Sequence, residues 1–491
     1  MGIEREQLWE HSVDAANWEE KLPIPAPPAL VEKQRAALEA ALEQDRRKVV
    51  VLDDDPTGSQ TVHGVEVLTR WSREEFTRAL TASGKMFFVL TNSRSLPEGQ
   101  AIELNAGIAQ ELVQASRDTG VAFTLVSRSD STLRGHFPAE TDELARILRQ
   151  AGSPVDAVVL VPFFEEGGRF TAWDVQWVRQ GDRMIPVSET EFAQDHLFGY
   201  RSSNLRDWVE ERTGGRIKAR EVLSLSLDLL RSQPPERVAD LLAAYQGPAI
   251  VVNATSYRDL EGAVAALLAA EARGKRYVYR TAASFLRVRG GISPRPLLGA
   301  DDLYQRGVPA SREGRKGGGL VVVGSYVRRT GAQLARLLKQ PEVVGIELRV
   351  QRILLSATSR QDEVDQASRT ITEALERGRV AVLYTSRDVQ TRPGEAGLQV
   401  GASIADALVE AVGRVEEAPR FVIAKGGVTS SRVATDALGV RCAFVLGPIL
   451  PGVPVWRLGS ETRFPGIPYV IFPGNVGDEN GLVEAVRRLE G

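Results

Sequence analysis

Three adjacent carboxylates follow a short apolar run of β-branched residues: Asp53, Asp54 and Asp55, with Pro56, Thr57 and Gly58 after them. Like charges at this spacing repel one another, so the cluster is costly unless a cation, a magnesium ion or a reacting hydroxyl uses it. The alternative is a helix N-cap whose spare acids stay in solvent. The position directly after a predicted strand favours a functional role.

Arginine-containing polar runs follow two more apolar segments, at residues 91–95 and 127–136. Their hydroxyl, amide and guanidinium donors suit a polyhydroxy carboxylate, because arginine can hold a carboxylate through two parallel hydrogen bonds. Helix capping accounts for some of the serines, such as Ser93 or Ser131, but not for three arginines together. These arginines are Arg94, Arg128 and Arg134. We therefore expect a sugar acid rather than an apolar ligand.

A further polar run, at residues 162–169, ends in Gly167, Gly168 and Arg169. The glycines could let the backbone approach a ligand beside the arginine. A Gly-Gly turn next to a solvated arginine is an equal alternative.

The second half of the chain has neither a GxxxxGK[ST] phosphate loop nor a clean GxGxxG fingerprint. Instead it has three glycine-bearing turns after predicted strands, at residues 324–325, 425–431 and 473–478. Glycine lets the chain come close to a phosphate, and backbone N–H groups of the following helix can hold its oxygens. Hydroxyls in the second turn would add donors. Together the three turns predict a phosphate-binding site.

All of these residues need strands that end at a common edge. Short, apolar, β-branched runs predict buried parallel strands, and the Ala-, Leu-, Glu- and Gln-rich segments between them predict helices, such as 98–119 and 260–273. This alternation is typical of an α/β fold, in which ligands bind beyond the carboxyl ends of the strands. The predicted strands are 49–52, 87–90, 121–126, 157–161, 249–252, 277–279, 320–323, 380–383, 421–423 and 442–446.

The length of 491 residues predicts more than one domain, since single cores rarely grow beyond about 250–300 residues. The α/β pattern breaks between Arg287 and Gly319 into a stretch dense in Gly, Pro, Arg and Ser. We expect an N-terminal extension at residues 1–45 and two α/β domains with mainly parallel sheets, at 46–300 and 315–491.

Lysine and arginine number 61 against 64 acidic residues, for a net charge of -3. This balance gives no global electrostatic reason to bind nucleic acid or an anionic membrane. Cys442 is the only cysteine, so no internal disulfide can form and a structural zinc site is not favoured. No stretch approaches the roughly 18 apolar residues of a membrane span, and we expect a cytoplasmic protein. A homodimer is expected only because it is the commonest assembly of soluble enzymes.

The order of these motifs resembles the four-carbon acid sugar kinases. The resemblance rests on the Asp-rich strand end with Thr57-Gly58, the runs at 91–95 and 130–135, and the later Gly-Gly-Val-Thr-Ser and Pro-Gly-Asn turns. It extends in order from about Val49 to the C-terminus. It implies a sugar-acid-binding domain, then a nucleotide-binding domain, with an active-site cleft between them. It also implies transfer of phosphate from ATP to an acid such as threonate, erythronate or an oxo derivative.

Carried over by position, the resemblance places Ser325, the Gly426 to Thr429 turn and Gly474 around ATP, and it places Asp54, Asp55, Arg94, Asp130 and Arg134 facing the acid. The full sets of candidates combine this resemblance with the chemistry of the residues themselves. Phosphoryl transfer needs Mg2+ across the phosphates and an acid to orient and deprotonate the acceptor hydroxyl. The catalytic candidates are Asp54, Asp55 and Asp130. The substrate-binding candidates are Asp53, Arg94, Arg128, Ser131, Arg134 and Arg169, with Arg94, Arg128 and Arg134 as a clamp for the carboxylate. The ATP-binding candidates are Ser325, Gly426, Gly427, Val428, Thr429 and Gly474.

Three places depart from the family pattern: Arg128 stands where lysine is usual, Val428 stands where glutamate is usual, and the final turn reads Pro473-Gly474-Asn475-Val476-Gly477. Two other functions compete with the kinase. One is a sugar-acid sensor that uses nucleotide only to fix a conformation. The other is an NAD-linked oxidoreductase, which the α/β pattern allows but the missing GxGxxG fingerprint does not favour.

Overall fold

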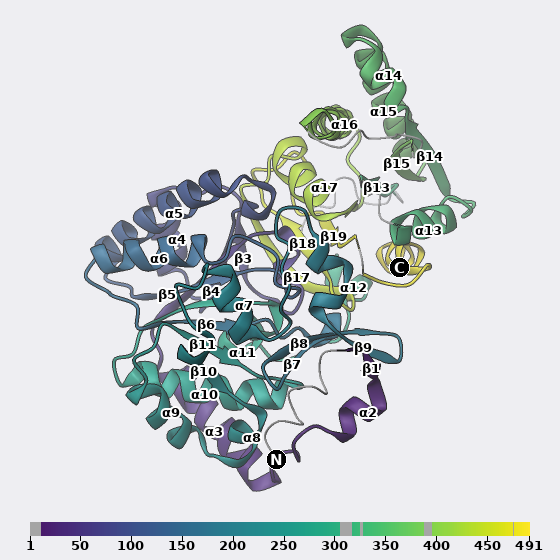
Figure 1. Ribbon diagram of the computed structural model, residues 1–491. Helices are drawn as coiled ribbons and strands as arrows, with labels where there is room; N and C mark the ends of the chain where they lie inside the picture. The colour runs from purple at the N-terminus through teal and green to yellow at the C-terminus, as the bar shows by residue number, and fades with distance from the viewer. Residues whose placement is uncertain (1–10, 305–316, 325–327, 387–394, 475) are drawn as a thin grey trace. The chain divides into compact units, whose positions relative to one another are not determined.

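The computed structural model describes residues 11–304, 317–324, 328–386, 395–474 and 476–491 (Figure 1). The chain forms two compact units. Unit 1 comprises residues 1–54 and 71–293, and unit 2 comprises 55–70 and 294–491. The expected boundaries, 46–300 and 315–491, differ from these units at three places. Residues 55–70 and residues 294–300 belong to unit 2, and the expected N-terminal extension of residues 1–45 belongs to unit 1.

The main sheet of unit 1 is parallel, and its strands are apolar and almost entirely buried, as expected where helices cover both faces. In spatial order its strands are β10 (Val222–Leu225), β11 (Ala249–Val252), β6 (Ala157–Val161), β12 (Tyr277–Thr281), β5 (Phe123–Arg128), β2 (Lys48–Asp53) and β4 (Met86–Leu90).

Two groups of helices cover this sheet (Figure 1). One group comprises α4 (Arg73–Thr81), α5 (Glu98–Thr119) and α6 (Ala139–Gln150), and the other comprises α3 (Pro28–Gln44), α9 (Pro235–Ala244) and α10 (Tyr257–Ala272). The buried amide of Gln34 in α3 donates to the Leu230 carbonyl at 2.7 Å. Helix α3 is therefore part of the unit 1 core. Shorter helices of unit 1 are α2 (Ala15–Glu20), α7 (Leu205–Arg212), α8 (Leu227–Ser232) and α11 (Ala283–Arg289).

A small antiparallel sheet in unit 1 was not predicted from the sequence. Its strands, in order, are β1 (Val13–Asp14), β9 (Arg183–Pro186), β8 (Val175–Gln180) and β7 (Arg169–Ala172). The β7–β8 hairpin turns at Trp173 and Asp174, with φ of 55° and 65°. Such a turn normally carries Asn-Gly or Asp-Gly, so the usual hairpin signal is missing from the sequence.

The sheet of unit 2 mixes parallel and antiparallel strands. Its order is β3 (Glu66–Leu68), β17 (Cys442–Leu450), β18 (Val453–Leu458), β19 (Pro468–Phe472), β16 (Val422–Lys425), β13 (Leu320–Val323), β15 (Val380–Thr385) and β14 (Val343–Leu348). The strands from β19 to β14 are parallel. Helices of this unit are α12 (Ala300–Leu303), α13 (Arg328–Leu337), α14 (Val350–Leu355), α15 (Ala357–Glu376), α16 (Glu395–Gly413), α17 (Gly427–Arg432) and α18 (Gly481–Glu490).

The predicted α/β class with mainly parallel sheets is confirmed. Every predicted strand overlaps an observed one, and the predicted helix 98–119 matches α5. No helix in the described ranges is long and apolar enough to cross a membrane.

Candidate functional site

The loops after β2, β4 and β5 start at one edge of the unit 1 sheet. Strand β2 lies between the other two, and Asp53 is level with Leu90 on β4 and with Arg128 on β5. Parallel strands in this register end together, so side chains that follow them can meet. The polar runs predicted from the sequence therefore lie side by side.

Arg128 compensates the first two carboxylates of the cluster. Its Nη1 lies 3.2 Å from Asp53 Oδ1 and 3.0 Å from Asp54 Oδ1. All three side chains are at most 5% exposed, so these ions lie in a low-dielectric environment where an unpaired charge would be strongly destabilising. The hydroxyl of Ser129 also donates to Asp54, at 3.1 Å.

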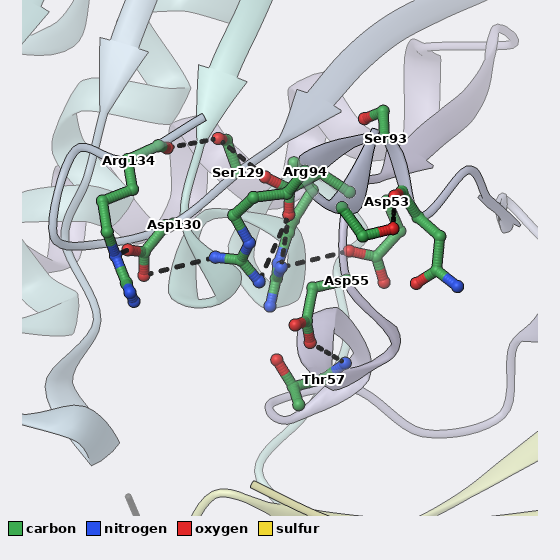
Figure 2. Close-up of polar contacts among 12 residues, drawn as sticks. Asp53, Asp55, Thr57, Ser93, Arg94, Ser129, Asp130 and Arg134 are labelled. Atoms are coloured by element: carbon green, nitrogen blue, oxygen red, sulfur yellow. Dashed lines mark hydrogen bonds and ion pairs between the residues drawn. The ribbon is translucent and has the colours of Figure 1, made fainter. Parts of the chain in front are cut away.

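Asp130 is the second charged centre, and its carboxylate lies between two guanidinium groups (Figure 2). Arg134 Nε donates to it at 2.6 Å, and Arg94 Nη1 lies 3.7 Å away. Arg94 also lies 3.8 Å from Asp54. Burial alone would raise the pKa of Asp130, but Arg134 and Arg94, with a hydrogen bond from Thr132, hold it well below its usual value. Asp130 is therefore ionised and a weak proton acceptor.

Buried side chains from other elements fix the loop that carries Asp130 and Arg134. Gln176 of β8 donates to the Ser131 carbonyl at 2.9 Å, and the Tyr200 hydroxyl donates to the Thr132 carbonyl at 2.7 Å. The Arg134 carbonyl accepts from Arg280 Nη2 at 3.1 Å and from Ser129 at 3.2 Å. Ser131 itself therefore contributes a backbone contact that holds the loop.

Arg169 begins β7 and packs near Arg134 on a shared aromatic ring. The guanidinium carbons of Arg134 and Arg169 lie 4.9 Å and 5.8 Å from the Phe192 ring centroid. Arg134 also lies 3.8 Å from Asp195. All the predicted substrate-binding residues thus belong to unit 1, and the assigned contacts with the acid remain a prediction.

Two charged residues beneath this edge were missed by sequence reasoning. Arg280 lies one residue past the predicted end of the strand at 277–279, and a basic residue in an otherwise apolar strand was the available signal. It is 5% exposed and stacks on Phe137 and Trp208, at 5.3 and 5.6 Å. Burial lowers the pKa of Arg280 to about 10, against the opposing effect of nearby carboxylates.

Glu140 of α6 is the other missed residue, and it looked like an ordinary acid of a first helical turn. It is 3% exposed and accepts from Asn105 Nδ2 at 3.2 Å. Burial and the nearby Asp54 carboxylate raise the pKa of Glu140 to about 7, while hydrogen bonds from Ser93 and Asn105 oppose the rise.

Unit 2 brings its glycine turns together in the same way. Val323 of β13, Lys425 of β16 and Phe472 of β19 are level in the sheet, so the turns that follow these strands start at one edge. Gly426 has φ of 110°, a conformation that favours glycine, and its N–H donates to the Phe472 carbonyl at 2.8 Å. The three turns predicted to bind phosphate are therefore neighbours.

Close contacts join these turns to one another. A Cβ on Gly324 would lie 2.3 Å from Thr429 Oγ1, so a larger residue there would displace the Thr429 side chain. The buried Lys425 ammonium donates to the Pro473 carbonyl at 2.5 Å, and Thr330 donates to the Gly474 carbonyl at 3.2 Å. Burial, followed by the nearby Arg329, lowers the pKa of Lys425 to about 7.

The third carboxylate of the acidic cluster belongs to unit 2. Asp55 caps the 3-10 turn Pro56–Ser59 by accepting from the Thr57 N–H at 2.9 Å, so the helix-cap alternative holds for this residue. Its Oδ2 would lie 2.5 Å from a Cβ on Gly427, which places the carboxylate against the Gly-Gly turn. Asp54 and Asp55 are consecutive, and the chain passes from unit 1 to unit 2 between them.

Two ATP-binding predictions need separate comment. Val428 is 56% exposed. Its side chain is apolar and therefore adds no polar contact at the turn. Ser325 lies outside the described residues. No group of three or more His, Cys, Asp or Glu side chains suited to a metal ion is found in the described part of the chain.

Comparison with known protein families identifies both halves of the chain. A sugar-binding N-terminal domain family matches residues 49–289, and a nucleotide-binding C-terminal domain family matches residues 320–482. The first match contains the edge of the unit 1 sheet at which Arg94, Arg128, Asp130 and Arg134 lie, called here the arginine–aspartate edge. The second match contains the glycine turns of unit 2. The two family models thus assign a sugar-binding domain to the first part of the chain and a nucleotide-binding domain to the second.

Individual relatives agree with this assignment. The chain is 28% identical over 371 residues to a D-threonate kinase of Cupriavidus necator, covering 73% of this chain and 78% of the relative. It is 32% identical over 197 residues to a 3-oxo-tetronate kinase of the same organism, covering 38% of this chain and 42% of that relative. The chain belongs to the four-carbon acid sugar kinase family.

A solved structure shares the fold. It is described as a putative tRNA synthase from Salmonella typhimurium LT2, with a TM-score of 0.65 and 17% sequence identity. The similarity covers 91% of this chain and 100% of the other, and at this identity it speaks for the fold alone.

Replacing Gly135 with alanine tests the packing of the Asp130 loop. Gly135 has φ of 112°, and an added Cβ would lie 2.8 Å from Ser129 Oγ and 3.3 Å from Asp54 Oδ2. Gly152 has φ of 84° but nothing within 4 Å, so Gly152→Ala controls for the backbone strain alone. We expect Gly135→Ala to lower the free energy of unfolding by about 2 kcal/mol more than the control, measured by urea titration. Equal losses would show that the loop is not tightly packed.

Replacing Glu140 with glutamine tests its raised pKa. The pKa rises from 4.5 to about 7, so the folded state binds this proton more tightly than the unfolded state. The wild-type protein therefore loses stability as the pH rises from 4.5 through 7. We expect Glu140→Gln to gain stability relative to wild type between pH 5 and pH 8, by a maximum on the order of 3 kcal/mol. Chemical denaturation at both pH values measures this, and a variant that gains nothing at pH 8 contradicts the assignment.

Proposed function

We propose that this protein transfers the γ-phosphate of ATP to a hydroxyl of a four-carbon or five-carbon sugar acid. The observation that carries the proposal is the arginine–aspartate edge of unit 1, within a domain matched to a sugar-binding family. The names of the relatives, D-threonate kinase and 3-oxo-tetronate kinase, support acids such as threonate, erythronate or an oxo derivative.

The charges of unit 1 suit a small polyhydroxy anion. Arg128 is occupied by Asp53 and Asp54, which favours a charge-compensating role for it. Arg94 and Arg134 flank Asp130, with side chains 17% and 27% exposed, and are better placed to reach a ligand. In this proposal they bind the carboxylate, as guanidinium groups do in bidentate pairs. The aspartates would accept hydrogen bonds from the substrate hydroxyls.

The glycine turns of unit 2 suit the phosphates. Gly426 and Gly427 carry no side chain that would keep a phosphate away, and Thr429 adds a hydroxyl beside Gly324. Backbone N–H groups in such turns form anion-binding concavities. In this proposal the nucleotide phosphates lie along these turns and at Gly474.

Asp55 is the acid best suited to orient and deprotonate the acceptor hydroxyl. Asp130 is held ionised as a weak base, and Asp54 is engaged by Arg128 and Ser129. Asp55 lies against the Gly-Gly turn of the nucleotide-binding part and follows Asp54 directly in the chain. It is also the carboxylate that would help to hold Mg2+, an ion usually bound by one or two carboxylates together with substrate phosphates. Bound Mg2+ would supply neutralisation of the phosphate charge.

Acid-dependent release of ADP tests the proposed function. The assay gives the full-length protein Mg-ATP and a panel of four- and five-carbon aldonic and oxo-aldonic acids. We expect ADP release that requires one of these acids. Nucleotide binding together with acid binding but no turnover would instead indicate a sensor. Hydride transfer with NAD would indicate an oxidoreductase.

Replacing Asp55 with asparagine separates chemistry from binding. Loss of the Asp55 carboxylate should lower kcat by at least about 100-fold, because asparagine cannot accept the proton of the substrate hydroxyl. The dissociation constant of ATP, measured by calorimetry without Mg2+ and without the sugar acid, should change less than about threefold, a change worth under 1 kcal/mol. Asp362→Asn, on an exposed residue of α15, is the matched control and should leave kcat unchanged. Retained turnover in Asp55→Asn would remove this residue from the mechanism.

A further inference from the structure

A small cavity lies directly beneath Asp130 in unit 1. Its polar lining comes from Ser129, Asp130, Arg280 and Thr281, and its apolar lining includes Leu133, Leu160 and Trp208. The volume within which the centre of a water molecule could lie is about 10 Å3. A volume of this size holds about one oxygen-sized group, and a polar occupant needs partners that donate and accept hydrogen bonds.

The donor in this cavity is a buried guanidinium. Arg280 is 5% exposed, and its Nη2 donates to the Arg134 carbonyl at 3.1 Å. Its Nη1 is buried and makes no hydrogen bond to any residue that the structure describes. A buried N–H without an acceptor destabilises the protein, and a charged group does so more strongly, so an acceptor at this position would be strongly favoured.

The acceptor in the cavity is the carboxylate of Asp130. Hydrogen bonds from Thr132 and Arg134, and the positive charge of Arg94, keep this group ionised. An anionic occupant would be repelled by it, and an apolar occupant would leave Arg280 Nη1 unsatisfied. A hydroxyl group accepts from the arginine and donates to the carboxylate, and water has the same capacity.

We propose that this cavity is a one-oxygen subsite in which Arg280 and Asp130 bind a single hydroxyl of the acceptor acid, with a water molecule in the same place when the acid is absent. The proposal rests on the proposed function and extends it, because it makes Arg280 a determinant of which polyol acid binds. An acid lacking a hydroxyl at that carbon leaves the buried guanidinium unpaired and binds more weakly.

Calorimetric binding to the full-length protein, with no ATP, tests this subsite. The ligands are the preferred four-carbon acid and its monodeoxy analogues, and the variants are Arg280→Lys and Arg231→Lys. The Arg231 side chain is only 9% exposed and is held by Asp259, so it controls for the loss of a largely buried guanidinium. We expect Arg280→Lys to weaken binding of the acid by about 10-fold or more, and binding of one deoxy analogue by less than about twofold. Equal weakening of all ligands, or no weakening, overturns the subsite.

A high-resolution crystal structure of the wild-type protein gives a readout that does not depend on the variant's folding. In the free protein we expect an ordered water within hydrogen-bonding distance of Arg280 Nη1 and Asp130. In the complex with the acid we expect a substrate hydroxyl in its place. A water that stays in the complex overturns the substrate subsite, and a cavity without any oxygen overturns the whole proposal. Failure of every acid to bind would count against the proposed function, while the water would still test the cavity.

Discussion

The pairing of Arg128 with Asp53 and Asp54 is the interaction on which the site in unit 1 depends. Each buried carboxylate would be destabilising by several kcal/mol without a nearby cation. The register of β2 and β5 places Asp53 level with Arg128, so assembly of the sheet also brings the charges together. With these charges balanced, the loops after β2, β4 and β5 can crowd at one edge, and Arg94 can lie near both Asp54 and Asp130.

Much of the fold could be predicted because it follows from local patterns. Buried parallel strands read as short apolar runs, and the predictions at 157–161, 249–252 and 320–323 match β6, β11 and β13. The β7–β8 hairpin could not be predicted, since its turn uses Trp173 and Asp174 rather than glycine. The assignment of residues 55–70 to unit 2 also depends on contacts that no local pattern contains. One such contact is the hydrogen bond from Trp456 to Ser59.

Residues of the candidate site could be predicted from the sequence where polar and charged side chains come directly after a predicted strand. Arg94, Asp130 and Arg134 were found by their position, and the structure brings them together. Arg280 was missed because it is a single charged residue after the predicted strand at 277–279, and Glu140 was missed because an acid in a first helical turn has an ordinary explanation. Their importance comes from burial next to charges distant in sequence, such as Asp54 beside Glu140. A single sequence does not contain that proximity.

The central claim is that the acid binds in unit 1 and the nucleotide in unit 2. Hydrogen exchange measured by mass spectrometry tests this claim most directly. The acid and a non-hydrolysable ATP analogue would each be added alone to the full-length protein. The account predicts that the acid slows exchange at residues 91–96 and 129–136 but not at 426–432, and that the analogue slows exchange at 426–432. Protection of 426–432 by the acid, with none at 91–96 or 129–136, would contradict it.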